Sequence, residues 1–253
     1  LLDLSRYTRG EERLHFKTLI DGNTVNGRLV ALPWYTDAGV FYYRKDLLTR
    51  YNQPIPTTWK DFSAIAKRIQ TAERARGNPD FHGFMFQGKA DEGLTCHALE
   101  WIAGSGGGQV LSDTGDITVR NKAAAEALDM AASWVGNISP LGVLNHEPED
   151  SRGVFQSGNA LFMRNWPYAW AELNKPDSPL RGKVAFTTMV SEDGNLHAAT
   201  QGSWGFSLLV GSSRAGLRVI ARWCCSSTAE DSCRRCSSLS RNPSKFRIDC
   251  RWR

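Results

Sequence analysis

Three short segments combine aromatic rings with small or polar residues, a combination that suits carbohydrate binding. A pyranose ring presents apolar C–H faces edged by hydroxyl groups, so its site needs flat aromatic faces with planar polar groups around them. Each segment is expected in a turn or at the end of an element, where its rings would be accessible. The candidate ligand contacts are Trp34-Tyr35-Thr36-Asp37, Asn165-Trp166-Pro167-Tyr168 and Gly202-Ser203-Trp204.

A structural role is the alternative for every one of these rings, because large aromatic residues are often buried. The helical spacing around Trp59, Trp101 and Trp134 favours the core for those three. For the three candidate segments, the sequence leaves both interpretations open.

Carboxylates are the candidates for catalysis. A glycoside hydrolase needs two of them about 5–10 Å apart, and Asp37, Glu92, Glu100 and the acidic cluster at 147–150 could supply a pair. Most surface carboxylates are simply solvated, and the sequence does not bring any two face to face. A carbohydrate-active hydrolase therefore stays an alternative to a protein that binds without chemistry.

Metal and nucleophile chemistry receive little support. The sequence contains no Gly-x-Ser-x-Gly motif, and no two of its histidines have the spacing of metal ligands. Cys96 and His97 are neighbours in the chain, and a lone Cys in a helix is usually a small buried hydrophobic residue. The sequence thus predicts no catalytic residue, no metal and no cofactor. The dispersed histidines are His15, His82, His97, His146 and His197.

The composition is that of a globular protein, with 253 residues, 41% of them hydrophobic and 23% charged. No apolar run approaches the roughly 20 residues of a membrane-spanning helix, so a soluble chain is expected. The N-terminus reads LLDLSR and lacks the basic region and apolar core of a secretory leader. Either there is no leader, or the beginning of the protein is missing.

The formal charge of +5 comes from the C-terminal part of the chain. From Arg214 onward there are ten basic and three acidic residues, which leaves residues 1–213 with a net charge of −2. A nucleic-acid-binding protein needs clustered basic residues on its folded part, so no nucleic-acid partner is expected. Five of the six Cys also lie in this tail, which is rich in Arg and Ser. Cys233 and Cys236 have zinc-knuckle spacing, but unstructured sequence or a reading-frame error fits the tail better.

Alternating strands and helices predict an α/β fold. Strands are expected at 27–33, 39–43, 81–86, 160–163, 184–190 and 206–210, with an exposed turn at 34–37. Helices are expected from Asp46, over 59–75 with Thr58 as its cap, over 94–102, after the cap Asn121, and over 151–156. Ala124, Leu128, Ala131 and Val135 are expected to line one face of the fourth helix. Pro167 predicts a further helix whose mouth carries Trp166 and Tyr168.

The order of several motifs resembles the family 1 extracellular solute-binding proteins of ABC sugar importers, of the maltose/trehalose-binding type. The motifs are NGRLVALP at 26–33, YYRKDLL at 42–48, PTTW at 56–59 and FQSGN followed by ALFMRNWPYAW at 155–170. The resemblance implies a two-lobed periplasmic-binding-protein fold of type II. It also implies a ligand enclosed in the cleft between the lobes, and no catalysis. The first lobe and hinge strand would span 1–38, the second lobe 39–186 and the return to the first lobe 187–213.

The resemblance also implies roles for single residues. Tyr35 and Asp37 match a segment that supplies an aromatic ring and a sugar-binding carboxylate, while Trp166 and Tyr168 match the aromatic platform of the second lobe. Gly202 and Trp204 match a Gly-x-Trp turn of the first lobe. Glu92 and Cys96 match a loop and helix near the sugar.

For the whole protein, the resemblance implies a monomer that binds an α-linked di- or oligosaccharide and delivers it to membrane permease subunits. A non-sugar receptor of the same fold is the second alternative. The protein would be periplasmic or lipid-anchored outside the cytoplasmic membrane. Because the first βα units and the last helices of the family have no counterpart here, the fold is expected to be incomplete at both ends. The tail at 214–253 would not be native-like.

Overall fold

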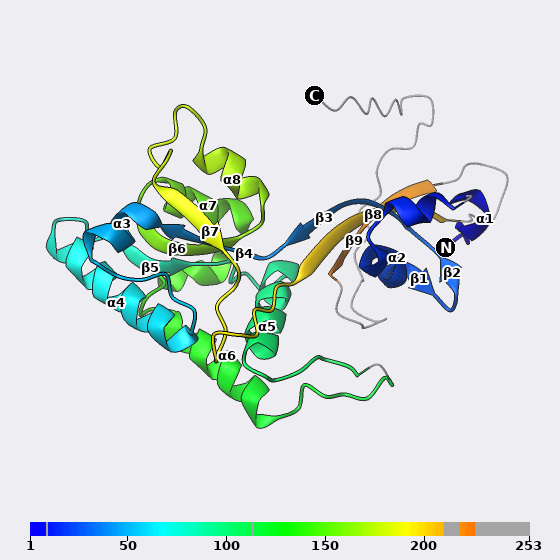
Figure 1. The fold of residues 1–253 in the computed structure, drawn as a ribbon, viewed down its shortest axis with the longest axis horizontal. Coiled ribbons are helices and arrows are strands. Elements are labelled where there is room, and N and C mark those ends of the chain that lie inside the picture. Colours follow the sequence, from blue (N-terminus) through cyan, green and yellow to red (C-terminus); the bar gives the residue numbers. More distant parts are fainter. Residues whose placement is uncertain (9, 113, 210–217, 226–253) are drawn as a thin grey trace. The chain divides into compact units, whose positions relative to one another are not determined.

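The computed structural model describes residues 1–8, 10–112, 114–209 and 218–225. The chain divides into two compact units (Figure 1). Unit 1 holds Leu1–Thr36 and the described residues that follow Gln201, while unit 2 holds Asp37–Gln201. The second division thus lies later than residue 186. Residues 187–201 stay with unit 2 because the Ser191 carbonyl accepts a hydrogen bond of 3.0 Å from the Trp59 amide, and Glu192 donates one of 2.8 Å to Gly104.

Unit 1 begins with short elements and a tight hairpin. They are α1 (Ser5–Thr8), η1 (Glu11–Leu14), α2 (Lys17–Gly22), β1 (Thr24–Val25) and β2 (Arg28–Leu29). Asn26 and Gly27 join β1 to β2 with φ angles of 49° and 73°, and an Asn-Gly pair suits a two-residue turn with positive φ. The strand expected over 27–33 is therefore divided between this hairpin and the start of the next strand.

A sheet of three strands completes unit 1, in the order β3 (Leu32–Ala38), β8 (Gln201–Leu209), β9 (Arg218–Cys225). The exposed turn expected at 34–37 is wrong, because these residues continue β3. Pairing with the distant strand β8 decides this. Thr36 Oγ1 also donates a 2.9 Å hydrogen bond to the Gly202 carbonyl. Strand β9 lies within the expected tail and pairs antiparallel with β8, with Trp204 opposite Trp223. Cys233 and Cys236 lie outside the described residues.

Unit 2 is built on a mixed four-stranded sheet in the order β5 (His82–Met85), β6 (Ala160–Asn165), β4 (Val40–Arg44), β7 (Val184–Thr187). Strands β5 and β6 are parallel, and β4 runs antiparallel to both β6 and β7. Every residue of β6 is buried, as expected for a central strand. All four strands overlap segments that the sequence predicts as strands, and β4 and β6 extend beyond the predicted ends.

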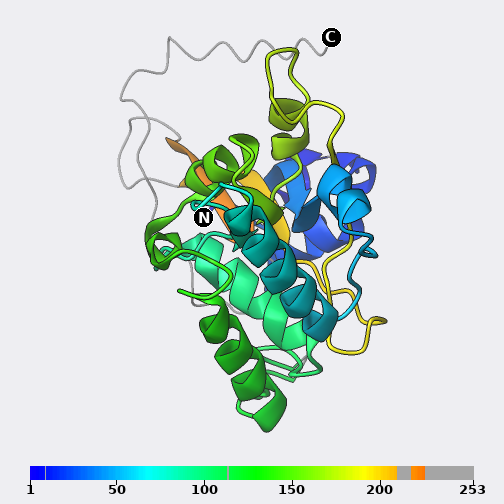
Figure 2. The same cartoon turned by 90° about the vertical axis from the view of Figure 1, so that its left-hand side faces the viewer.

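Two helices of unit 2 begin directly after their predicted capping residues, Thr58 and Asn121. Thr58 Oγ1 accepts a 3.2 Å hydrogen bond from the Asp61 amide, and Asn121 Oδ1 accepts one of 2.9 Å from the Ala124 amide. Helices α5 and α6 pack against each other (Figure 2). The helices are α3 (Lys45–Arg50), α4 (Trp59–Ala75), α5 (Glu92–Gly104), α6 (Lys122–Trp134), the 3-10 helix η2 (Leu141–Asn145), α7 (Pro148–Gln156) and α8 (Tyr168–Leu173).

Several details of these helices differ from expectation. Helix α5 begins at Glu92 rather than Leu94, and α7 at Pro148 rather than Ser151, because Asp91 and Glu147 are their caps. Leu128 is 43% exposed rather than packed, and Val135 lies just beyond the end of α6. The buried face of α6 consists instead of Ala124, Ala127, Ala131 and Trp134. Helix α8 begins at Tyr168, with Pro167 at its cap position.

Aromatic rings form the centre of the unit 2 core. Phe62 of α4 contacts Phe84 with ring centroids 4.9 Å apart and Trp134 with centroids 5.3 Å apart, both nearly edge-to-face. Trp59, Trp101 and Trp134 are each no more than 3% exposed, which confirms the core position predicted from their helical spacing. Helix α4 and helix α7 both pack on β5 and β6 (Figure 1), and α4 supplies Phe62 and Trp59 to this cluster.

Candidate functional site

The β3–β8 sheet of unit 1 brings three predicted ligand contacts together. Tyr35 and Trp204 stack with ring centroids 6.3 Å apart and an angle of 25° between their planes. Trp34 contacts the edge of Tyr35 at 5.2 Å and the ring of Phe206 at 5.3 Å. Trp34 is 60% exposed and Tyr35 42% exposed, so this aromatic face, defined by Trp34, Tyr35, Trp204 and Phe206, is accessible within unit 1. Gly202 and Ser203 are buried in β8.

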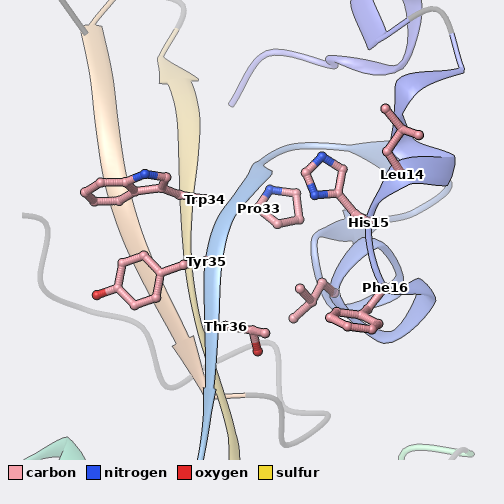
Figure 3. Close-up of a pocket in the computed structure, with 8 residues that line it drawn as sticks. Leu14, His15, Phe16, Pro33, Trp34, Tyr35 and Thr36 are labelled. Atoms are coloured by element: carbon pink, nitrogen blue, oxygen red, sulfur yellow. The ribbon is translucent and has the colours of Figure 1, made fainter. Parts of the chain in front are cut away.

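At least two cavities lie among the described residues of unit 1. In the first, of about 280 Å³, Pro33 and Thr36 extend from β3 toward the N-terminal segment, whereas the rings of Trp34 and Tyr35 extend toward β8 (Figure 3). The second, of about 470 Å³, has leucines as half of its lining and contains none of the predicted contacts. The first is smaller than the roughly 300–1,000 Å³ of common ligand pockets, so it does not form a complete site alone. Its lining is Leu14, His15, Phe16, Leu19, Pro33, Trp34, Tyr35 and Thr36.

The other predicted contacts belong to unit 2. Asp37 is half-buried there, and burial raises the pKa of its carboxyl, against which the positive charge of Arg164 acts. The charge of Arg164 opposes that rise and favours the ionised form, which accepts hydrogen bonds from hydroxyl groups. Asp37 therefore has the chemistry expected of a sugar-binding carboxylate.

Trp166 lies on the guanidinium of Arg164, whose Cζ atom is 4.0 Å from the ring centroid. The residue is only 7% exposed. The side chain of the buried Asn165 accepts a 2.8 Å hydrogen bond from the Trp166 amide and donates one of 3.0 Å to the Pro148 carbonyl. Tyr42 also donates to the Trp166 carbonyl at 3.0 Å. Asn165 thus fixes the backbone at Trp166 from a buried position. Trp166 itself exposes little of its ring.

Tyr168, the first residue of α8, presents more of its ring and is 36% exposed. Burial of its hydroxyl and the neighbouring Glu149 carboxylate raise the pKa of Tyr168 far above its usual value of 10. Glu149 in turn accepts a 2.9 Å hydrogen bond from Arg152 Nε. The phenol is therefore protonated, its oxygen end is fixed on α7, and the ring face is the part left for a ligand.

A buried polar network lies beneath Trp166, and the motifs of the sequence did not predict it. Arg164 forms a two-point ion pair with Glu100, with Nε–Oε2 and Nη2–Oε1 distances of 2.9 and 2.5 Å. Gln87 donates through Nε2 to the Arg164 carbonyl at 2.9 Å, and its backbone amide donates to His97 Nε2 at 3.0 Å. The i, i+3 spacing of His97 and Glu100 on one helix was the only local signal for this network.

Charge balance in this network determines the protonation of its members. Burial would raise the pKa of Glu100, but Arg164 and His97 outweigh that effect and lower it to about 2. Burial, aided by the charge of Arg164, lowers the pKa of His97 to about 4. At neutral pH the network therefore holds an ionised Glu100, a charged Arg164 and a neutral His97, whose Nε2 accepts the hydrogen bond from the Gln87 amide and whose Nδ1 carries the proton.

The carboxylates considered for hydrolysis have structural partners. Glu100 is in the ion pair, and Asp150 Oδ2 accepts a 2.9 Å hydrogen bond from the Glu147 amide within the capping box of α7. Glu92 is exposed and accepts a 3.1 Å hydrogen bond from the thiol of the fully buried Cys96. Cys96 therefore supports Glu92 and does not itself reach the surface.

The described residues contain neither a cluster of metal-binding side chains nor a membrane-spanning helix. No group of three or more His, Cys, Asp or Glu side chains in this part of the chain is placed to hold a metal ion. None of its helices combines the length and apolar content that a membrane span requires.

Comparison with known proteins identifies the family. The bacterial extracellular solute-binding protein family matches residues 9–223. A probable ABC transporter-binding protein of Deinococcus radiodurans is 46% identical over 207 residues, which cover 81% of this chain and 49% of that protein. A mannitol-binding protein of Pseudomonas aeruginosa is 25% identical over 208 residues, which cover 80% of this chain and 46% of that protein.

A solved structure supports the same assignment. Maltose-bound MalE3 of T. maritima is 40% identical and superimposes with a TM-score of 0.73, over 81% of this chain and 52% of that one. The chain spans about half the length of the curated relatives it matches. Its fold is that of the type II periplasmic solute-binding proteins, which confirms the predicted class. The chain belongs to the bacterial extracellular solute-binding protein family.

Proposed function

We propose that this chain binds a carbohydrate as part of a solute receptor that serves an ABC importer. The observation that carries the proposal is the aromatic face of unit 1, where Tyr35 and Trp204 stack with an angle of 25° between their rings. The exposed parts of the Trp34 and Tyr35 rings beside this pair offer apolar surface that can pack on the C–H face of a pyranose. Membership of the family supports the same function.

Unit 2 supplies complementary chemistry for the same ligand class. The ring of Tyr168 offers a second apolar face, and Asp37 can accept hydrogen bonds from sugar hydroxyls. That one ligand contacts the residues of both units remains a prediction. Trp34, Trp166, Asn165, Gly202, Ser203, Glu92 and Cys96 also remain predicted members of the site, and among them the fully buried Asn165 and Cys96 act by supporting their neighbours.

An α-linked di- or oligosaccharide is the ligand we favour. The T. maritima protein has maltose bound and is 40% identical to this chain, whereas the mannitol-binding relative is 25% identical. An acyclic polyol such as mannitol lacks the flat C–H face of a ring and gains less from aromatic stacking. The aromatic face therefore supports a cyclic sugar over a polyol.

The expected partners follow from this proposal. The receptor would act outside the cytoplasmic membrane as a monomer, and present its loaded form to permease subunits. A receptor that must also release its sugar needs a moderate affinity, on the order of micromolar, or about −8 kcal/mol.

Isothermal titration of the chain with maltose, trehalose, mannitol and a dipeptide tests the proposal. We expect saturable binding of maltose or trehalose with a Kd on the order of micromolar, weaker binding of mannitol, and none of the dipeptide. Preferential binding of the dipeptide would support a non-sugar receptor. Absence of saturable binding to any sugar or polyol would overturn the proposal. Measuring glucose after incubation with maltose tests the hydrolase alternative, for which glucose release is the required result.

A further inference from the structure

The two segments through which unit 2 continues into the rest of the chain both pass beside one buried carboxylate. Gly39 follows Ala38, the last residue of β3, and Thr200 precedes Gln201, the first residue of β8. The Gly39 amide donates a 3.2 Å hydrogen bond to the Thr200 carbonyl. The Thr200 amide donates one of 3.0 Å to Glu100 Oε1, and Thr200 Oγ1 donates one of 2.8 Å to the Cys96 carbonyl. Helix α5 therefore holds Thr200 directly, and Gly39 through its hydrogen bond to Thr200.

Glu100 can do this because Arg164 fixes its carboxylate. Oε1 of Glu100 accepts from both the Thr200 amide and Arg164 Nη2, and Oε2 accepts from Arg164 Nε. Both side chains are at most 1% exposed, so water does not replace these bonds. The fit at Gly39 is equally close, since a Cβ atom there would lie 2.0 Å from Glu100 Oε1 and 2.7 Å from Arg164 Nη2.

The same guanidinium also supports two predicted ligand contacts. Its Cζ atom lies 4.0 Å from the centre of the Trp166 ring, and its charge acts on the carboxyl of Asp37. A planar guanidinium suits both tasks at once, because it forms two parallel bonds to a carboxylate along its edge while its face packs on an aromatic ring. One ion pair thus joins the connecting segments to the proposed binding surface of unit 2.

We propose that Glu100 and Arg164 are positioning residues that fix the connecting segments at Gly39 and Thr200 and hold Trp166 in place for the ligand. The second part of this proposal rests on the proposed carbohydrate binding. The first part does not, because it concerns hydrogen bonds that exist without a ligand. We therefore test the two parts with separate measurements, so that failure of the positioning role can be told apart from failure of the proposed function.

The test uses Glu100→Gln, Arg164→Met and the milder Arg164→Lys, with Arg44→Met as the matched control. Arg44 also makes a two-point ion pair in unit 2, with Asp46 at 2.8 and 2.7 Å, but at the far end of β4. Glu100 has two acceptor oxygens, whereas Gln has one oxygen and one NH2 group. In Glu100→Gln, that NH2 group must therefore face a donor N–H group of either Thr200 or Arg164. Hydrogen exchange of single amides, followed by NMR, is the first readout, and maltose affinity is the second.

We expect the Thr200 amide to be protected in the unaltered chain although it lies outside the regular elements. In Glu100→Gln and both Arg164 variants, exchange at Gly39 and Thr200 should accelerate about tenfold or more relative to the amides of α4. Arg44→Met should leave that ratio unchanged. Equal acceleration at α4, Gly39 and Thr200 would overturn the positioning role, and Arg164→Lys decides the matter if Arg164→Met does not fold.

The ligand readout completes the test. Arg164→Lys should weaken maltose binding by about tenfold, since Lys lacks the planar face that packs on Trp166, while Arg44→Met should bind normally. Unchanged affinity in Arg164→Lys would overturn the link to the ligand. If the unaltered chain binds no sugar, the proposed function fails, yet the exchange ratios still decide whether the pair fixes the connecting segments.

Discussion

Arg164 packs its guanidinium on the ring of Trp166, with Cζ 4.0 Å from the ring centre, and does so while its edge is paired with Glu100. The contact joins a charged network that solvent does not reach to one of the predicted ligand contacts of unit 2. Removing water strengthens an ion pair but also makes an unpaired member costly. The consequences for stability can be measured without a ligand.

Removing one member of the Glu100–Arg164 ion pair should destabilise the folded chain. Arg164→Met leaves the Glu100 carboxylate buried without its partner, so we expect the free energy of unfolding to fall by about 3–5 kcal/mol. The double variant Glu100→Met/Arg164→Met removes both charges and should lose less than the sum of the two single variants. Urea unfolding of all four proteins gives the coupling energy. Additive losses, within about 0.5 kcal/mol, would show that the two residues act independently.

The absence of a side chain at position 39 is required by the same pair. A Cβ atom in Gly39→Ala would lie 2.0 Å from Glu100 Oε1, and we expect the strain to lower the free energy of unfolding by about 1–3 kcal/mol. Gly153 of α7 is the matched control, because a Cβ atom there meets nothing within 4 Å. Gly153→Ala should stabilise the chain by about 0.5–1 kcal/mol. Urea unfolding of both variants checks the opposite signs.

The stability of unit 2 should fall on mild acidification because of His97. Burial, with Arg164 nearby, lowers the pKa of this residue from 6.5 to about 4, so the folded chain binds the proton less readily than the unfolded chain. The stabilising contribution is complete above pH 6.5 and is lost as the pH falls toward 4. From about pH 7 to about pH 5 this amounts to about 2 kcal/mol.

The variant His97→Gln isolates that contribution, since a Gln oxygen can still accept a hydrogen bond but does not titrate. Urea unfolding at about pH 7 and about pH 5 should show a smaller loss in the variant than in the unaltered chain. His82 and His146, whose pKa values burial also lowers, affect both proteins alike. Equal losses in the two proteins would contradict the assignment of a neutral, buried His97.

Local signals in the sequence were sufficient for most elements of unit 2. Thr58 and Asn121 mark the starts of α4 and α6 through hydrogen bonds to amides three residues away. Such contacts need no knowledge of the rest of the fold. The four strands of unit 2 also follow their apolar composition, so the α/β class could be predicted without a structure.

Features that depend on distant residues could not be predicted in this way. Residues 34–37 have the composition of a turn, but pairing with β8 makes them part of a strand, and Thr36 bonds to Gly202 over 166 residues. Arg164 and Glu100 are 64 residues apart, and neither pattern nor spacing connects them. Among the candidate ligand contacts, the sequence found the exposed rings but did not separate them from supporting residues such as Asn165.

The central claim, that aromatic rings hold a sugar, is tested most directly by the maltose affinity of Trp204→Ala and Tyr168→Ala. The matched controls are Tyr7→Ala in unit 1 and Phe186→Ala in unit 2, which remove rings of residues that are 56% and 54% exposed and are not predicted contacts. By titration calorimetry, we expect each of the first two variants to lose about 1–3 kcal/mol of binding free energy, with the controls unchanged. Unaltered affinity in both Trp204→Ala and Tyr168→Ala would contradict this claim.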